Sequence, residues 1–488
     1  MTTWFVGQLR VAIMCAALAA VCAPRASHAQ QPDSAAWLAD LTQLRAEMTA
    51  HYANLQWAVG ARGLDLPALT SQTERQLASA RTVPEARAVM EAFLRAFGDG
   101  HLYVSWPSAA NGAAGRGEAP LCTRLGFGGS PRAGLPFHRA ARFTAIQSAD
   151  SVFFPAGVLE TPSGCRIGVL RIGLFSQYAF PQLCDEVARE LGLTASSPCD
   201  EACEVRVEAA AGNLLTAALV RQLELLGRER TELLLVDITG NGGGTNWVQP
   251  AARTLTPVRL ATPAQGFVRH PHWTREFARR VEVLMGARRG ADAALRGRID
   301  AAVAAFRRAE EEAGRRCDLA PLWEGRSVGC SLTATAGVFA SGALPYAAPG
   351  ELGPASPAHR YLFSPSLYAY REGVYAGPLA VLVDRGTSSS AEYFTAMLAD
   401  NGAATIVGHP TDGTGCGYTN GGIRTVLARS GAVVRMPDCV RYRADGTNEV
   451  EGVTPHVLVP WHAVDNPYQR AKRVVAVLDT LRIPAPVR

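Results

Sequence analysis

The segment around Ser389 combines residue types and spacing that suit nucleophilic chemistry. The apolar run Leu379–Val383 precedes a tight turn and the apolar-periodic stretch 390–400, a pattern that predicts strand, turn and helix. A serine at that turn lies at a helix N-terminus, where unpaired N–H groups and the helix dipole favour an anion. Acyl transfer needs such a place, because negative charge develops beside the nucleophile. Ser389 and Glu392 also have capping-box spacing, and the segment taken alone favours that structural role.

Three further segments contain residue types that catalysis uses. A strand-like run ending at Asp237 leads into a glycine-rich turn that includes Gly243, although glycine turns are also common in plain loops. His101 ends the sequence Phe-Gly-Asp-Gly-His, and imidazole has a pKa suited to a general base near neutrality. A lone histidine is more often structural. The fourth segment, Glu449-Val-Glu451, directly precedes Gly-Val-Thr-Pro.

In their order along the chain, the four segments resemble the motifs of the tail-specific, or carboxy-terminal processing, serine proteases and their tricorn-core relatives. The resemblance spans residues 97 to 455. It implies a nucleophile three residues before the glutamate that opens the helix, at Ser389, with Ser388 and Ser390 as open alternatives. It also implies an oxyanion hole formed by the N–H groups of Gly243 and Ser390.

The same resemblance implies the base and the acid of the site. His101 is expected to be the general base, as in members of the family that lack a catalytic lysine. Glu451 is expected to hold the second nitrogen of His101, as the acid of a triad does. Asp99 and Glu449 are alternatives for that role.

Departures from the family pattern separate two mechanisms. Members with a Ser-Lys dyad carry the lysine about 25 residues after the serine, where this chain has Thr414. Lys472, the only lysine, lies far beyond that position. We therefore expect a Ser-His-acid site, typical of the histidine branch.

Thr239 stands where the family often has arginine, so we expect an ion pair made there to be lost. Gly100 and His456 replace a serine and an aspartate of related motifs, so we expect no catalytic role at either position.

These expectations describe a serine hydrolase, a peptidase that acts on a peptide or protein substrate. An esterase would use the same triad. A non-catalytic binder of hydrophobic ligands or peptides is also open, since interphotoreceptor retinoid-binding protein resembles this family. No cofactor and no metal are expected, because His270-Pro-His272 lacks a third ligand and Cys199 and Cys203 lack a partner pair.

Two structural regions must position these residues. Apolar residues at helical spacing predict a helical bundle over residues 30–98. Alternating strand-like and helical segments predict an α/β catalytic domain over 99–488, and the resemblance implies a crotonase-like core. A helical insertion is expected at about 250–325. It is either a lid over the site or a surface insertion that packs its apolar stripe on the core.

The first 29 residues are typical of a signal peptide. Arg10 precedes the apolar run Val11–Ala23, and small residues lead to a cleavage site after Ala29. This predicts export to the periplasm or beyond, with lipoprotein anchoring at Cys22 as the less favoured alternative. No later run is long enough to predict membrane insertion. The formal charge is +5 without a basic run interleaved with aromatic residues, so we expect no nucleic-acid partner.

Nine cysteines follow the predicted signal, an odd number that leaves at least one thiol unpaired. An exported chain with so many cysteines is expected to form disulfides. The strand-like runs 421–428 and 432–436 predict a hairpin that brings Cys416 and Cys439 together as one disulfide. The alternative is two unrelated buried thiols.

Overall fold

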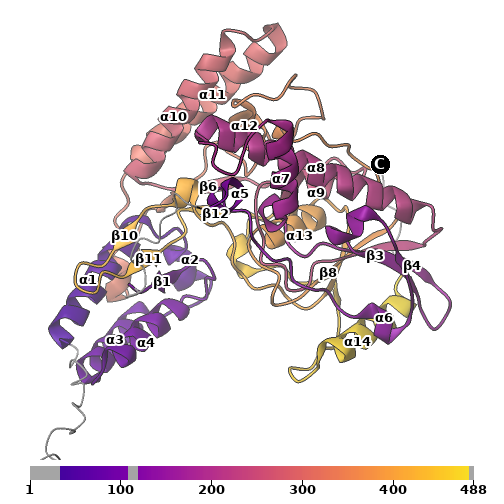
Figure 1. Ribbon diagram of the computed structural model, residues 1–488. Helices are drawn as coiled ribbons and strands as arrows, with labels where there is room; N and C mark the ends of the chain where they lie inside the picture. Colours follow the sequence, from indigo (N-terminus) through magenta and orange to yellow (C-terminus); the bar gives the residue numbers. More distant parts are fainter. Residues whose placement is uncertain (1–32, 108–118, 483–488) are drawn as a thin grey trace, which may run out of the picture.

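The computed structural model describes residues 33–107 and 119–482, so the predicted signal peptide lies outside the described residues. Four helices form the N-terminal part (Figure 1). They are α1 Ser34–His51, α2 Leu55–Gly60, α3 Leu66–Ser79 and α4 Val83–Arg95. The side chains of Asp33, Asp65 and Thr82 accept backbone N–H bonds at the starts of α1, α3 and α4, which explains where these helices begin.

The helical N-terminal region predicted from the sequence is confirmed. Leu41, Leu44 and Met48 of α1 are buried, as are Phe93 of α4 and Phe97 just beyond it. Their recurrence every three or four residues places them on the inward faces of the helices. The division of the chain into domains at residues 98 and 99 stays a prediction.

A seven-stranded sheet with the order β13-β9-β8-β5-β4-β3-β2 organises the part of the structure after the helical region. Strands β13 to β4 are parallel, and β4, β3 and β2 are antiparallel. The strands are β2 Arg142–Ile146, β3 Ala156–Glu160, β4 Arg166–Arg171, β5 Leu233–Asp237, β8 Leu379–Val383, β9 Thr405–Gly408 and β13 Val457–Leu458. The apolar runs predicted to be buried strands are β5 and β8, so the mixed α/β class is confirmed.

Helices cover both faces of this sheet (Figure 1). One face packs against α8 Glu201–Gly227, α9 Val248–Thr254 and α13 Ser390–Asp400. The other packs against α6 Phe137–Ala140 and α14 Pro467–Thr480. Shorter helices are α5 Leu121–Arg124, α7 Pro181–Glu190 and α12 His359–Leu362. Because both faces are covered, β5 and β8 are buried along their whole length, and their sequences are almost entirely apolar.

The parallel arrangement of β5 and β8 fixes where the functional loops lie. The two strands are hydrogen-bonded neighbours, with Asp237 beside Leu382. Their carboxyl ends therefore meet at one edge of the sheet. The glycine-rich loop follows β5 at that edge, and the turn that contains Ser389 follows β8.

Two small sheets join segments that lie far apart in the sequence. In the first, β1 Tyr103–Ser105 pairs with β11 Val433–Arg435, which also pairs with β10 Thr425–Val426. In the second, β12 Cys439–Arg441 pairs with β6 Gln265–Val268, which pairs with β7 Thr333–Ala334. Pairing of β1 with β11 carries His101, two residues before β1, to the loop that starts at Thr411.

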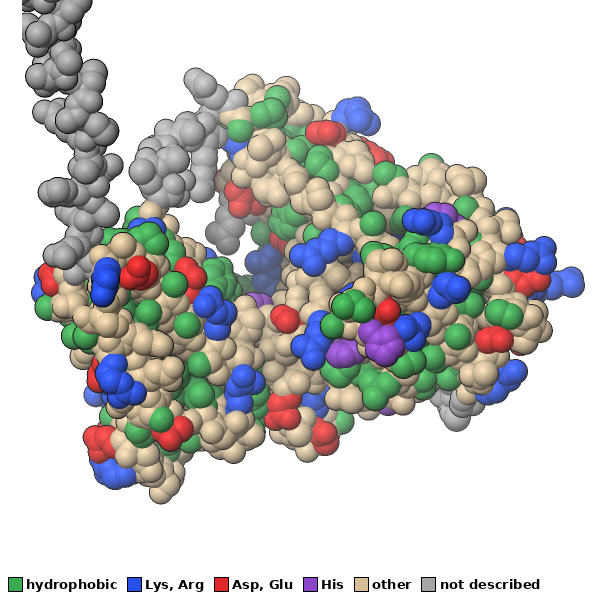
Figure 2. Space-filling view, turned by 90° about the horizontal axis from the view of Figure 1, so that it is seen from below, with side chains coloured by type: hydrophobic (Ala, Val, Ile, Leu, Met, Phe, Trp, Pro, Cys, Tyr) green, Lys and Arg blue, Asp and Glu red, His purple; other side chains and the backbone are tan. Residues whose placement is uncertain are grey.

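The predicted helical insertion contains a hairpin of two long helices, α10 Pro271–Arg288 and α11 Ala293–Gly314, which projects from the body of the molecule (Figure 1). The apolar stripe of α11 is buried, and the ring of Phe306 stacks on that of Phe277 in α10 at 5.9 Å. Whether the hairpin gates the site stays a prediction. On the face seen in Figure 2, basic and acidic side chains are interspersed.

Four disulfides are present in the described part of the chain. They are Cys122–Cys184, Cys199–Cys203, Cys317–Cys330 and Cys416–Cys439. The predicted Cys416–Cys439 pair is confirmed, and among the described cysteines Cys165 is the free thiol. Such disulfides are typical of proteins that fold in an oxidising compartment. Within residues 33–107 and 119–482, no helix combines the length and apolar character needed to cross a bilayer.

We expect the Cys416→Ser/Cys439→Ser double variant to lose roughly 3 kcal/mol of unfolding free energy in the chain-entropy view of a disulfide. It should also lose activity, because this bridge holds the chain beside His101. The matched control is Cys317→Ser/Cys330→Ser, which should lose comparable stability and keep activity. Urea unfolding and turnover assays measure both effects. A Cys416 peptide that alkylates without reductant would contradict the bridge.

Candidate active site

Ser389 occupies an unusual backbone conformation at the start of α13. Its φ of 56° and ψ of −122° are rare for a residue with a side chain, and such strain is commonly found at functional sites. Glu392 closes a capping box with it, and the Glu392 carboxylate accepts the Ser389 N–H at 3.1 Å. Among the described residues, the Ser389 hydroxyl makes no hydrogen bond to His101. Catalytic contacts are often loose in an unliganded site.

The glycine loop after β5 packs directly against the serine turn. A Cβ on Gly243 would lie 2.7 Å from the nitrogen of Ser390 and 2.9 Å from the Cβ of Ser389, so a side chain does not fit there. The φ of 101° at Gly243 also favours glycine. Its N–H donates to Asn241 Oδ1 at 2.9 Å. The loop and the turn that the sequence predicts to form an oxyanion hole are therefore adjacent, and the Gly243 donor is engaged by Asn241.

His101 lies half-buried against the loop that carries Thr414. Its Nδ1 is 2.9 Å from the carbonyl oxygen of Thr414. A carbonyl only accepts, so in the neutral ring Nδ1 carries the proton and Nε2 has a free lone pair, as a general base requires. Burial, followed by the positive charge of Arg441, lowers the pKa of His101 to about 4. The imidazole is thus neutral at ordinary pH.

Contacts around His101 fix its main chain and explain a glycine at position 100. Its N–H donates to Asp99 Oδ1 at 2.9 Å, and its carbonyl accepts the hydroxyl of Tyr418. A Cβ on Gly100 would lie 2.7 Å from Thr414 Oγ1. The serine that related enzymes place before the histidine would therefore collide with Thr414. Burial raises the pKa of Asp99 to about 6.

The buried carboxylate of Glu392 links the serine turn to the histidine loop. Besides the Ser389 N–H, it accepts Thr411 Oγ1 at 2.6 Å and the N–H groups of Gly413 and Thr414, both at 2.7 Å. The carbonyl of Thr414 in turn contacts His101. One side chain thus holds both the turn of the predicted nucleophile and the residue that orients the predicted base. Burial raises the pKa of Glu392 to about 7.

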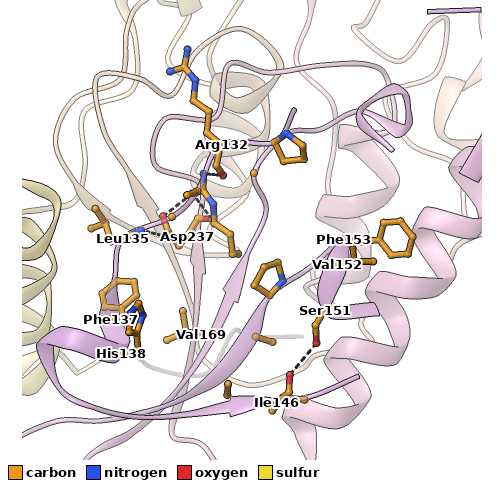
Figure 3. Close-up of a pocket in the computed structure, with 18 of the residues that line it drawn as sticks. Arg132, Leu135, Phe137, His138, Ile146, Ser151, Val152, Phe153, Val169 and Asp237 are labelled. Carbon is orange, nitrogen blue, oxygen red and sulfur yellow. Dashed lines mark hydrogen bonds and ion pairs between the residues drawn. The ribbon is translucent and has the colours of Figure 1, made fainter. Parts of the chain in front are cut away.

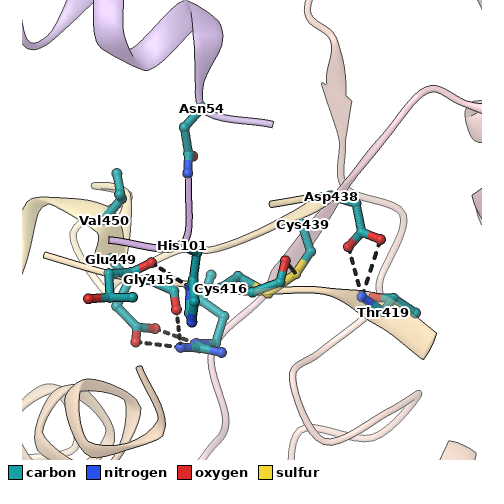
Figure 4. Close-up of a disulfide and its surroundings, with 12 residues drawn as sticks. Asn54, His101, Gly415, Cys416, Thr419, Asp438, Cys439, Glu449 and Val450 are labelled. Atoms are coloured by element: carbon teal, nitrogen blue, oxygen red, sulfur yellow. Dashed lines mark hydrogen bonds and ion pairs between the residues drawn. A yellow bond between two sulfur atoms is a disulfide. The ribbon is translucent and has the colours of Figure 1, made fainter. Parts of the chain in front are cut away.

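A second buried pair supports the same loop. Arg441 and Glu449 form a two-point ion pair, with Nε–Oε2 at 2.6 Å and Nη2–Oε1 at 2.8 Å. Arg441 also donates to the carbonyl of Gly415 at 2.9 Å and lies over the ring of Tyr393. Figure 4 shows His101 beside Gly415, Glu449 and the disulfided Cys416. Sequence reasoning missed Arg441, because it lies on a short strand with no recognisable motif.

Glu451 lies apart from His101 in this structure. Its carboxylate is exposed and accepts the indole N–H of Trp57 at 3.1 Å. Within the described residues no hydrogen bond joins it to His101. Asp99 and Glu449 are the two alternatives for the acid. The Glu449 carboxylate forms an ion pair with Arg441, and the Asp99 carboxylate contacts the main-chain N–H of His101 rather than its ring. The role of Glu451 as the acid stays a prediction.

Asp237, at the end of β5, forms an ion pair with an arginine of the neighbouring strand. Thr239 stands in the position of the family's arginine, and Asp237 instead pairs with Arg171 of β4 at 3.0 Å. Arg171 Nη2 also donates to the Thr239 carbonyl at 2.7 Å, and Thr239 Oγ1 donates to Asp237. The expectation concerned a pair made from position 239, and it is not contradicted, because Arg171 reaches Asp237 from the neighbouring strand, where the register places the two residues side by side. An arginine inside the otherwise apolar run 167–172 was the available signal.

Lys472 lies on the other side of the sheet from the serine turn. It is exposed on α14, which packs on one face, whereas Ser389 begins α13 on the opposite face. Its ammonium lies over the ring of Tyr468 in the same helix. This placement offers no support for a Ser-Lys dyad.

Comparisons with known proteins identify the family and the fold of the chain. Residues 204–459, just over half of the 488-residue chain, match peptidase family S41. The fold is similar to that of mature CPAF complexed with lactacystin, at 14% identity and a TM-score of 0.57, covering 91% of this chain and 98% of that chain. A second structure, a crystal structure of mature CPAF, matches at 14% identity and a TM-score of 0.57, covering 92% of this chain and 97% of that chain. The two structural matches show a shared fold.

The fold and the family match together define a peptidase. The chain belongs to peptidase family S41. It is accordingly a serine-type peptidase, and its substrates are peptides.

We expect Glu392→Gln to lower kcat by roughly 10²-fold or more, since a misplacement of about 1 Å at a catalytic group costs that much. The amide presents one acceptor oxygen to four donors, so the loop at Thr414 and the turn at Ser389 shift apart. The matched control is Asp150→Asn, at a carboxylate that is 8% exposed and pairs with Arg221 away from the site. It should lower stability and leave kcat unchanged.

The pH profile separates Glu392 from a merely structural glutamate. All four of its partners donate, so the protonated carboxyl must lose a contact. With its pKa raised to about 7, kcat/KM of the wild type should fall as pH decreases through that value. Glu392→Gln should lack this decline and keep only the decline near pH 4 that belongs to His101. Identical acid limbs in both proteins would contradict the assignment.

Proposed function

We propose that this serine-type peptidase is exported and cleaves peptide bonds through an acyl-enzyme formed on Ser389. The observation that carries the proposal is the continuous path from the Ser389 N–H through the Glu392 carboxylate to Thr414 and His101. It unites the turn and the histidine, which are remote in sequence. Export is supported by the four disulfides and by the signal-like sequence of residues 1–29, and the catalytic core is proposed to be crotonase-like.

In the proposed reaction, the Ser389 hydroxyl attacks the scissile carbonyl and His101 Nε2 takes its proton. The imidazolium then gives this proton to the leaving amine. The N–H groups of Ser390 and Gly243 stabilise the oxyanion. For Ser390 this is supported by its place at the first turn of α13, where N–H groups lack intrahelical partners. The Gly243 N–H must first break its hydrogen bond to Asn241 Oδ1. Water, deprotonated by His101, hydrolyses the acyl-enzyme.

The histidine branch of the family is proposed on the residue that replaces the lysine. Thr414 cannot act as a base, but its main chain does two things here: its carbonyl orients His101 and its N–H is held by Glu392. In the dyad enzymes, the lysine at this position would direct its amine toward the serine. In this chain the main chain of the same loop contacts the imidazole of His101 instead.

We expect Ser389→Ala to abolish both turnover and labelling by a fluorophosphonate probe. Its unfolding free energy should change by only about 1 kcal/mol, the worth of a helix cap. Ser388→Ala and Ser390→Ala are the neighbouring controls and should still be labelled. His101→Ala should lose turnover, whereas Lys472→Ala keeps it. Absence of labelling in the wild type would favour a non-catalytic binding protein, and hydrolysis of esters alone would favour an esterase.

We expect Glu451→Gln to lower kcat on the order of 10³-fold or more if Glu451 is the acid, because loss of a triad acid leaves the histidine misoriented. Trp57→Phe removes the indole N–H that holds Glu451 in this structure and should leave kcat nearly unchanged. Glu449→Gln is the contrasting variant. It breaks a buried ion pair and should cost about 3–5 kcal/mol of stability. Full activity in Glu451→Gln would assign the orientation of the ring to main-chain carbonyls such as that of Thr414 instead.

A further inference from the structure

A large cavity opens at the same edge of the seven-stranded sheet as the serine turn. Its volume is about 620 Å³, and it is lined by the ends of neighbouring strands. Ile146 ends β2, Ala156 begins β3, Arg171 ends β4 and Asp237 ends β5. Ser389 follows the carboxyl end of β8, and the strand order places β5 next to β8 and β4 one strand further. Neighbouring strands are about 4.8 Å apart, so the cavity, which Asp237 of β5 borders, reaches its apolar wall at Val169 of β4 roughly 10 Å across the sheet from β8.

The walls of the cavity are mainly apolar and aromatic. Rings come from Phe137 of α6, Phe143 of β2, Phe153 and Phe180. Figure 3 shows Phe137 and Phe153 on opposite sides of the cavity. Phe153 and Phe180 contact each other edge-to-face at 5.1 Å. Val152, whose side chain is labelled beside Phe153 in Figure 3, is 61% exposed. Apolar surface left open to water is commonly a site where another apolar group binds.

Arg132 lies between this cavity and the glycine loop. Its backbone lines the cavity, and its carbonyl is held by Arg171 Nη2 at 3.0 Å. Its side chain reaches the glycine loop, since Cδ would lie 3.6 Å from a Cβ on Gly240. In Figure 3 the guanidinium points away from the cavity. Among the described residues the guanidinium has no carboxylate partner, so a cation stands free on the path from the cavity to Gly243.

We propose that the cavity binds a bulky apolar side chain of the peptide substrate, about three residues from the scissile bond, and that Arg132 favours an acidic substrate residue in between. An extended peptide advances about 3.3 Å per residue, so three residues span the roughly 10 Å across the sheet from β8 to the apolar wall at β4. The aromatic walls suit phenylalanine, leucine or a similar side chain. This inference rests on the proposed function, because it assigns a substrate preference to the Ser389 site.

The test is cleavage of matched peptides by the full-length protein, with products located by mass spectrometry. Peptides with phenylalanine or leucine three residues from the cleaved bond should have at least tenfold higher kcat/KM than peptides with serine there. Ala145→Trp, which fills the cavity from an exposed position on β2, and Val152→Asp should remove this preference. The matched control is Val464→Asp, at a 90% exposed valine outside the cavity, which should retain it. Arg132→Glu should reverse a preference for acidic over basic substrate residues between the scissile bond and the third position.

Failure of this inference is distinguishable from failure of the proposed function. If the fluorophosphonate labels Ser389 and peptides are cleaved with equal kcat/KM whatever the residue at the third position, the cavity assignment is overturned and the peptidase stands. If Ser389 is not labelled and no peptide is cleaved, the proposed function itself is overturned. A change of oligomeric state in Val152→Asp, without any change in preference, would make the cavity a contact between copies and would also overturn the assignment.

Discussion

The site depends on one buried carboxylate and the four hydrogen-bond donors that surround it. An unpaired charge in the protein interior is strongly unfavourable, so Glu392 is stable only while Ser389, Thr411, Gly413 and Thr414 all remain in place. The converse is equally strict, because three of these donors are main-chain N–H groups that need a buried acceptor. The serine turn and the 411–414 loop therefore cannot move independently. A network of this kind is rigid when complete and costly when one member is missing.

The surroundings of this carboxylate are arranged to keep the loop in place. The Arg441–Glu449 pair ties Gly415 to β12, and the Cys416–Cys439 bridge ties the next residue to the same strand. Burial, and after it the positive charge of Arg441, lowers the pKa of His101 and so keeps the ring neutral. Structural support and electrostatic tuning thus come from the same buried arginine. The loop that carries a lysine in the dyad enzymes is here held on both sides by other means.

Sequence reasoning reached the elements that local patterns determine. The apolar runs of β5 and β8, the capped helix after Ser389 and the helical N-terminal region all follow from periodicity and capping. The Cys416–Cys439 pair followed from a strand-turn-strand pattern. Side-chain contacts that depend on strand register could not be predicted from the sequence. Arg171 meets Asp237 only because β4 and β5 are parallel neighbours, and Glu392 gains Thr411 and Thr414 through a loop that no local rule predicts.

The wide separation of Thr414 and His101 has a consequence for biosynthesis. The two residues are 313 positions apart, and His101 reaches its place only through the pairing of β1 with β11. Contacts between such distant segments form slowly, because a long loop must close first. A ribosome finishes the histidine hundreds of residues before the serine, so a chain still being synthesised lacks part of the site. The proposed enzyme would therefore stay inert during synthesis, without an inhibitor, until its last strands are in place.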